Sequence, residues 1–161
     1  MKTLKQQAQL VQQAYAYASD PSKRPASSIG KIVDSKSNEI MGFVTDDNTV
    51  VIRGSMTLHD WIKDLEFEED SFVGFDGLIE CGFMDMYSSL MYVSLVSTNK
   101  IGEPLHTMMF QSDNIIGHSL GSALGALLAY ELKTTGEVTL FACPKVGNAE
   151  FVASFNMRVP N

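Results

Sequence analysis

A Gly-His-Ser-Leu-Gly pentapeptide at residues 117–121 constrains this chain more than any other feature of its sequence. The apolar pair at residues 115–116 comes before it, and small and apolar residues fill 122–133 after it. This order predicts a buried strand, a sharp turn and a helix. Such a turn projects the hydroxyl of its central residue, Ser119, into the open. The sequence therefore predicts a nucleophilic serine.

The residue types around Ser119 suit acyl transfer. Gly117 and Gly121 stand two residues on either side of it, where glycine lets a strand and a helix approach closely. The helix N-terminus favours developing negative charge, and the N–H of Leu120 is placed to donate to an oxyanion. His118 would point away from the serine oxygen, so we expect it to pack rather than to act as the base. The alternative is a tight turn with an incidental serine.

The rest of the chain predicts a mixture of helices and strands. Apolar residues recur every three or four positions up to Pro21, which predicts one face of a helix. That face contains Leu4, Ala8, Val11, Tyr15 and Ala18. We also expect a loop at 25–28, a hairpin of strands 40–45 and 49–53, a short amphipathic helix near 59–67 before an acidic strand or loop, a helix over 83–96, and a strand at 138–142.

The second half of the chain thus predicts the strand–helix–strand unit of a parallel sheet. Neither an internal repeat nor a linker divides the sequence, and 45% of its residues are hydrophobic. We therefore expect residues 1–161 to form one α/β domain, with a mixed, mostly parallel sheet and flanking helices.

Composition narrows the possible partners and the compartment. The 12 Lys and Arg side chains against 19 Asp and Glu leave a net charge of −7, which disfavours binding to nucleic acid or adsorption to an anionic membrane. No run approaches the ~20 apolar residues of a membrane-spanning helix, and the N-terminus does not resemble a signal peptide. We therefore expect a cytoplasmic protein. Cys81 and Cys143 are expected to be buried free thiols.

Three further segments, taken with the pentapeptide, resemble the class 3 lipases, the fungal triacylglycerol lipase type of α/β-hydrolase. Residues 50–55 and 60–65 are similar to the family's strand with its R-G-[ST] turn and to its D-W-x-x-D-L lid segment; residues 81–87 are similar to its G-F-x-x-x-Y helix start; residues 141–151 are similar to its G-x-P-[RK]-V-G-N-x-x-F segment. These segments stand in the family's order from about residue 5 to 161, although Ser122 replaces a common glycine after the pentapeptide.

The resemblance implies a role for each matching residue. Ser119 would be the acyl nucleophile, and Ser55 and Leu120 would form the oxyanion hole. Residues 56–65 would be a lid that opens at a lipid–water interface, with Trp61 either in that lid or an ordinary core residue. The implied activity is hydrolysis of acylglycerol-type lipid esters through an acyl-enzyme, with neither a metal nor an organic cofactor.

The resemblance also exposes a shortfall. Arg158–Asn161 is similar to the R-x-x-N segment that precedes the family's catalytic aspartate, and the triad Asp and His have no matching positions. His59 and His106 match no family position, and Asp113 should be remote from the serine. We therefore expect a C-terminally truncated domain with weak or no esterase activity and with an exposed sheet edge that favours dimerisation. The alternative is a non-catalytic module that binds an acyl ligand or a complementing chain.

Overall fold

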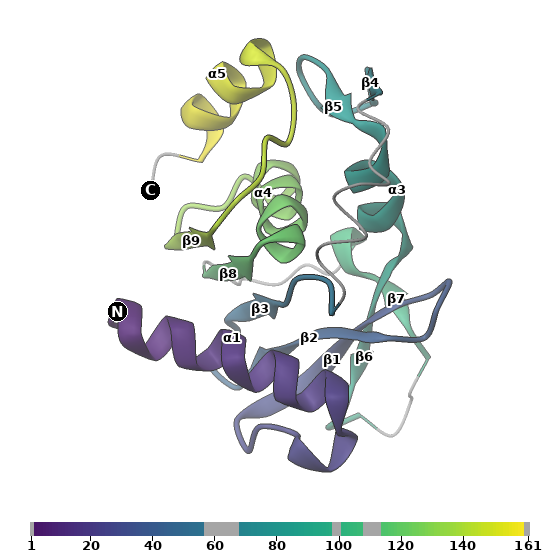
Figure 1. The fold of residues 1–161 in the computed structure, drawn as a ribbon, viewed down its shortest axis with the longest axis vertical. Helices are drawn as coiled ribbons and strands as arrows, with labels where there is room; N and C mark the ends of the chain where they lie inside the picture. Colours follow the sequence, from purple (N-terminus) through teal and green to yellow (C-terminus); the bar gives the residue numbers. More distant parts are fainter. Residues whose placement is uncertain (1, 57–67, 98–100, 108–113, 160–161) are drawn as a thin grey trace.

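A seven-stranded sheet forms the centre of the computed structural model, which describes residues 2–56, 68–97, 101–107 and 114–159 (Figure 1). In spatial order its strands are β7 (Glu103–Pro104), β6 (Leu90–Ser94), β1 (Ser28–Asp34), β2 (Ile40–Thr45), β3 (Val50–Ile52), β8 (Ile115–His118) and β9 (Val138–Phe141). The helices are α1 (Leu4–Ser19), α3 (Cys81–Ser89), α4 (Leu120–Leu132) and α5 (Ala149–Arg158), with 3₁₀ turns η1 (Pro21–Lys23) and η2 (Leu105–Thr107). A small second sheet pairs β4 (Glu69–Asp70) with β5 (Ile79–Glu80).

The main sheet is mixed, as predicted, but parallel pairing is confined to one side of it. β3 with β8 and β8 with β9 pair in parallel, whereas the pairings of β1 with β2, β1 with β6, β2 with β3 and β6 with β7 are antiparallel. Strands joined by short turns pair antiparallel, and a parallel neighbour needs a crossover such as α4 between β8 and β9. Among the described strands, the share of parallel pairing is therefore smaller than the sequence predicts.

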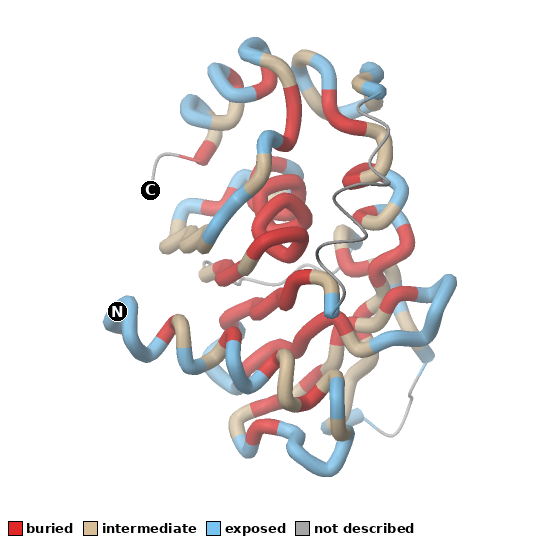
Figure 2. Tube along the Cα trace, in the orientation of Figure 1, coloured by how far each residue is buried: buried red, intermediate tan, exposed pale blue. Residues whose placement is uncertain are grey.

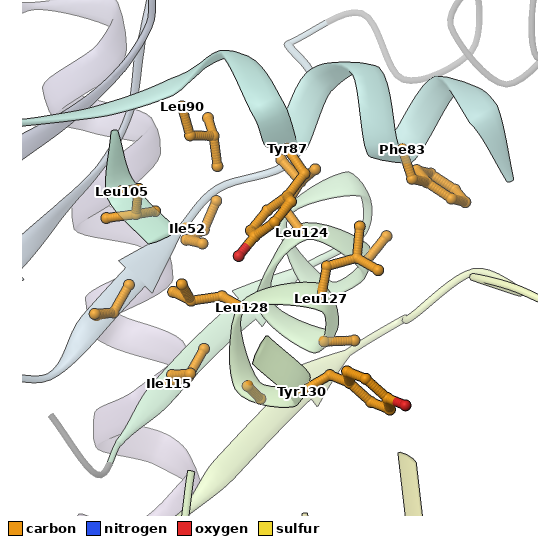
Figure 3. Close-up of a cluster of buried hydrophobic side chains, with 14 of the residues drawn as sticks. Ile52, Phe83, Tyr87, Leu90, Leu105, Ile115, Leu124, Leu127, Leu128 and Tyr130 are labelled. Atoms are coloured by element: carbon orange, nitrogen blue, oxygen red, sulfur yellow. The ribbon is translucent and has the colours of Figure 1, made fainter. Parts of the chain in front are cut away.

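Helices cover both faces of the sheet (Figure 1). α1 packs on one face, where Val11 and Ala14 meet Val51 and Ile116. α3 and α4 cover the other face, in the cluster that contains Ile52 and most other buried side chains (Figure 3). Successive residues of β3 and β8 thus point to opposite faces, and each strand is buried on both sides.

α4 is the most deeply buried helix of the described chain (Figure 2). Every residue from Leu120 to Tyr130 is buried, because small residues on the sheet side and leucines on the α3 side leave no polar face. The predicted helix over 122–133 is confirmed, and it begins two residues earlier.

The predicted N-terminal helix is confirmed, but its buried face is rotated. Thr3 caps α1 through a capping box with Gln6. The buried residues are Gln7, Val11, Ala14 and Tyr17. The predicted face began at Leu4, which is 67% exposed. Tyr15 and Tyr17 stand two positions apart and so lie on different faces of the helix, which left its rotation open in the sequence; contact with the sheet decides it.

The predicted helix over 83–96 is wrong in its second half. α3 ends at Ser89, and Leu90–Ser94 form β6, which pairs with Gly30–Asp34 of β1. β1 itself begins at Ser28, the last residue of the predicted loop. Leu90, Leu95 and Met91 satisfied a helical spacing, but their position beside β1 offers backbone hydrogen bonds along a sheet edge, and this pairing decides their structure.

Other expectations have mixed outcomes. The hairpin of β2 and β3 is confirmed, and β4 is the predicted acidic strand. Both cysteines are free thiols, but the expected burial is wrong: Cys81 is half-buried, and Cys143 is exposed in the turn after β9. The predicted helix near 59–67, with Trp61, lies outside the described residues. β9 is the outermost described strand on its side, so dimerisation through that edge stays a prediction. Among the described helices, none is long and apolar enough to span a membrane.

Candidate active site

Ser119 occupies the tight turn between β8 and α4. Its backbone has a φ of 55° and a ψ of −122°, a conformation that residues with a β-carbon rarely adopt. The turn is held by its neighbours: the Ser119 N–H donates to the Phe141 carbonyl of β9 at 2.9 Å, and the Ser119 carbonyl accepts from the N–H of Ser122 at 2.9 Å. The Ser122 hydroxyl donates to the same Phe141 carbonyl at 2.7 Å. The strained residue is therefore fixed from both β9 and α4.

The two glycines of the pentapeptide stand where backbone meets backbone. A β-carbon on Gly117 would lie 2.4 Å from the carbonyl oxygen of Gly121, and one on Gly121 would lie 2.3 Å from the carbonyl oxygen of Ile52. Both separations are far below van der Waals contact. The close approach of β8, α4 and β3 at this turn thus requires glycine at both positions.

The turn after β3 lies directly against Ser119. A β-carbon on Gly54 would lie 3.0 Å from the Ser119 β-carbon and 2.9 Å from the His118 carbonyl oxygen. Ser55, the next residue, is half-buried, and Leu120 opens α4 on the other side of the serine. Its N–H is one of the helix's first donors, which have no carbonyl partner within the helix. The structure therefore brings together Ser55, Ser119 and Leu120, the three residues that the sequence assigned to nucleophile and oxyanion hole.

His118 is held by α1 rather than by the serine. Its Nδ1 lies 2.9 Å from the Tyr15 hydroxyl, and the two rings meet edge to face with their centroids 5.8 Å apart. Ser119 is 7% exposed, and its side chain makes no capping hydrogen bond to the N-terminus of α4. This arrangement agrees with the expectation that His118 packs.

His106 lies toward the other end of α4. It lines a cavity of about 410 Å³ together with Tyr87 and Glu131, and its ring centroid is 6.2 Å from that of Tyr87. The Tyr87 hydroxyl donates to the Glu131 carboxylate at 2.5 Å. Glu131 is twelve residues of helix, or about 18 Å, from Ser119. His59 and Asp113, the other candidates from the sequence, lie outside the described residues.

Two polar residues near the serine escaped the sequence analysis. Arg53 is 1% exposed, and Tyr15 reaches the turn from α1. The sequence marks residues 53–55 only through their resemblance to a family turn, and it predicts Tyr15 only as an apolar position on a helix face. Arg53 directly follows the apolar run at residues 50–52, and a charged residue at the end of a buried strand is a sequence signal for a functional role. No local pattern of this kind indicates Tyr15.

A second polar network fastens α5 to α4. The Tyr130 hydroxyl, on a fully buried side chain, accepts the Asp76 N–H at 3.0 Å and lies 2.9 Å from the Asp76 carboxylate and 2.8 Å from the Ser154 hydroxyl. Ser154 also donates to that carboxylate at 2.6 Å. The Arg158 guanidinium lies 4.4 Å over the Tyr130 ring and pairs with Asp76. The start of the predicted R-x-x-N segment is therefore tied to the core.

Across the described ranges, no cluster of three or more His, Cys, Asp or Glu side chains is arranged to hold a metal ion.

The strain at Ser119 predicts that glycine there stabilises the fold. Ser119→Gly removes the β-carbon from a sparsely populated conformation and should raise the free energy of unfolding by about 1 kcal/mol, after the extra chain entropy of glycine is subtracted. Urea denaturation measures this. Ser119→Ala is the control, because it removes the hydroxyl but keeps the β-carbon. Equal stability of the two variants would show that the turn is not strained.

Known proteins resemble the chain in sequence and in fold. The model of the family described as Lipase (class 3) matches residues 49–161. The secreted mono- and diacylglycerol lipase A of Penicillium cyclopium is 31% identical over 130 residues, which cover 72% of this chain and 40% of that protein. Phospholipase A1-II 4 of Oryza sativa subsp. japonica is 26% identical over 137 residues, which cover 68% of this chain and 35% of that protein. The chain thus spans well under half the length of these relatives.

A solved structure supports the fold. The Rhizomucor miehei lipase, in a propeptide complex, superposes with a TM-score of 0.59 at 19% identity, covering 99% of this chain and 58% of that one. This similarity confirms the predicted α/β-hydrolase-like architecture. Because the family model matches more than half of the sequence, the chain belongs to the class 3 lipase family.

Proposed function

We propose that this chain carries the nucleophilic part of a serine-dependent hydrolase of lipid carboxylic esters. The observation that carries the proposal is the strained Ser119 turn, with the Gly54–Ser55 turn packed directly against it. Family membership supports the reaction class. The names of the relatives, which include acylglycerol lipases, a phospholipase A1 and the Arabidopsis thaliana galactolipase DONGLE, support esters of lipids as substrates.

The proposed reaction has two steps. Ser119 Oγ attacks the ester carbonyl, its proton passes to a base, and the tetrahedral oxyanion accepts hydrogen bonds from the N–H groups of Leu120 and Ser55. The C–O bond to the alcohol then breaks, and the alcohol leaves with the proton. Water attacks the acyl-enzyme by the same route, which releases the fatty acid and restores Ser119. Contact with a lipid–water interface is part of this proposal.

A second candidate is a module that binds an acyl ligand or a complementing chain without turnover. One observation favours it: His106 and His118, the described histidines, contact Tyr87 and Tyr15 rather than the serine hydroxyl. A site without its base retains a residual acceleration of about 10³–10⁴ over water through its oxyanion hole and binding groups. The two candidates therefore differ in rate by several orders of magnitude.

A fluorophosphonate probe and a short-chain p-nitrophenyl ester test the proposal. Intact-mass analysis and peptide mapping should find one phosphonyl group on Ser119 and none on Ser119→Ala. Modification or ester hydrolysis that survives in Ser119→Ala would overturn the nucleophile. Rapid hydrolysis that is lost in this variant would overturn the second candidate, and phosphonylation without hydrolysis would support it.

A further inference from the structure

Both polar groups of Gly54 are held by side chains that the proposed reaction does not use. The Gly54 N–H donates to the Tyr15 hydroxyl at 3.0 Å, and the Gly54 carbonyl accepts from Arg53 Nη1 at 2.6 Å. Gly54 is also the residue that packs against Ser119. Its two hydrogen bonds therefore act at the border of the candidate site.

The second of these bonds sets the direction of the Ser55 N–H. The Gly54 carbonyl and the Ser55 N–H belong to one peptide group, which is planar and trans in the described chain. The two bonds of such a group point in opposite directions. Because Arg53 holds the carbonyl on one side, the Ser55 N–H is turned to the other side.

Arg53 is rigid enough for this task. Its side chain is 2% exposed, and it makes three hydrogen bonds through three different nitrogens. Nε donates to the Ile40 carbonyl at 2.8 Å, and Nη2 pairs with the Glu39 carboxylate at 2.9 Å. A planar guanidinium that is fixed at two nitrogens, by Ile40 of β2 and by Glu39 just before it, presents the third in one direction only.

Tyr15 joins the same turn to the pentapeptide. Its oxygen accepts the Gly54 N–H at 3.0 Å and lies 2.9 Å from His118 Nδ1, so the hydroxyl bonds to both residues. Burial raises the pKa of Tyr15, which keeps the hydroxyl protonated. One side chain thus contacts both segments that meet at Ser119.

We propose that Tyr15 and Arg53 are positioning residues, which clamp the two sides of Gly54 and fix the orientation of the Ser55 N–H, the group that the proposed function assigns to the oxyanion formed at Ser119. The inference rests on the proposed function. It adds to that function an explanation of how the oxyanion hole keeps its geometry: a tyrosine from the N-terminal helix and a buried arginine fix the position of Gly54.

The test compares Tyr15→Phe with Tyr17→Phe in the whole chain. Both tyrosines lie on α1 and pack against the same sheet face, but only Tyr15 bonds to Gly54. Two readouts are needed. Hydrogen exchange and ¹⁵N relaxation report the order of the Gly54 and Ser55 amides, and the rate of phosphonylation by a p-nitrophenyl phosphonate reports the site.

We expect Tyr15→Phe to loosen both amides and to slow phosphonylation by about 10- to 100-fold, the effect of a small misplacement of a catalytic group. Tyr17→Phe should change neither readout. The ³¹P shift of the adduct should move in Tyr15→Phe, because it senses donors to the phosphonyl oxygen. Arg53→Lys keeps the positive charge but loses the planar guanidinium and its three donors. Provided that thermal melting shows a folded chain, this variant should show the same looser amides and slower phosphonylation as Tyr15→Phe.

The outcomes separate the clamp from the proposed function. Amides that stay ordered, or an unchanged rate, in Tyr15→Phe would overturn the clamp while Ser119 still reacts. Wild-type chain that never reacts at Ser119 would overturn the proposed function, and with it the catalytic purpose of the clamp, even where the amides loosen.

Discussion

Gly121→Ala is expected to prevent stable folding. The new β-carbon would lie 2.3 Å from the Ile52 carbonyl oxygen and 2.5 Å from that of Arg53, so it meets the backbone of a central strand rather than a flexible side chain. α4 has no room to retreat, because it is buried on all sides. We expect a loss of about 3 kcal/mol or more in the free energy of unfolding, a large part of the stability of a domain this size.

Gly125→Ala is the matched control on the same helix. Its β-carbon would lie 3.2 Å from a methyl of Ile115 and 3.4 Å from one of Leu140, and side chains can shift by a few tenths of an ångström. Alanine also gains up to about 1 kcal/mol in helix propensity over glycine. Urea denaturation should therefore place this variant within about 1 kcal/mol of the wild type. Similar losses in both variants would show that α4 tolerates no added methyl, and that the glycine position in the pentapeptide is not special.

Tyr130→Phe is expected to cost about 2 kcal/mol, since a buried network loses its central hydroxyl. The Asp76 N–H then has no acceptor, and the Ser154 hydroxyl loses a neighbour 2.8 Å away. The phenyl ring keeps the packing against Phe75 and Phe151, so the loss is polar rather than steric. The measurement is the urea midpoint at pH 7, with Tyr17→Phe as the control for removal of a tyrosine hydroxyl elsewhere.

The loss of stability in Tyr130→Phe is also expected to depend on pH. The Ser154 and Tyr130 hydroxyls, with Arg158, lower the pKa of Asp76 below its ordinary value. A carboxylate with a lowered folded pKa stabilises the fold above its unfolded pKa of about 3.9, and this stabilisation is lost as the pH falls through the folded pKa. Tyr130→Phe removes one of the donors, so its deficit relative to wild type should shrink below about pH 4. A deficit that stays constant down to pH 2.5 would contradict the role of the carboxylate.

The elements that the sequence predicted well are those whose signals are local. The β2–β3 hairpin and the β8–α4–β9 unit are each specified by residues close together in the chain, and the Ser119 turn has its glycines two positions away. β1 and β6 were missed. β6 exists through pairing with the distant β1, whereas β1 also pairs with its neighbour β2 across a short turn, so distance in the chain accounts for β6 alone. Leu90–Ser94 carried a helical spacing that held no information about Gly30–Asp34.

The site divides in the same way. Ser119 and Leu120 were predicted from one pentapeptide, and Ser55 from a family resemblance. The clamp was not predicted, because the Tyr15 hydroxyl bonds to residues 39 and 103 positions further along the chain. A hydrophobic pattern assigns such a tyrosine to a helix face, but it does not predict which residues the hydroxyl will bond to.

The hydrogen bond from the Ser119 N–H to the Phe141 carbonyl also has a consequence for the order of folding during synthesis. While the chain is being synthesised, the pentapeptide emerges before β9, and the N–H of its serine has no partner until Phe141 has been added and paired. At about 5–20 residues per second, this interval lasts about a second or more. The strained conformation cannot persist without its anchor, so a nascent chain carries the complete motif in relaxed form. The turn at Ser119 is anchored to β9 only when this last described strand closes onto the sheet.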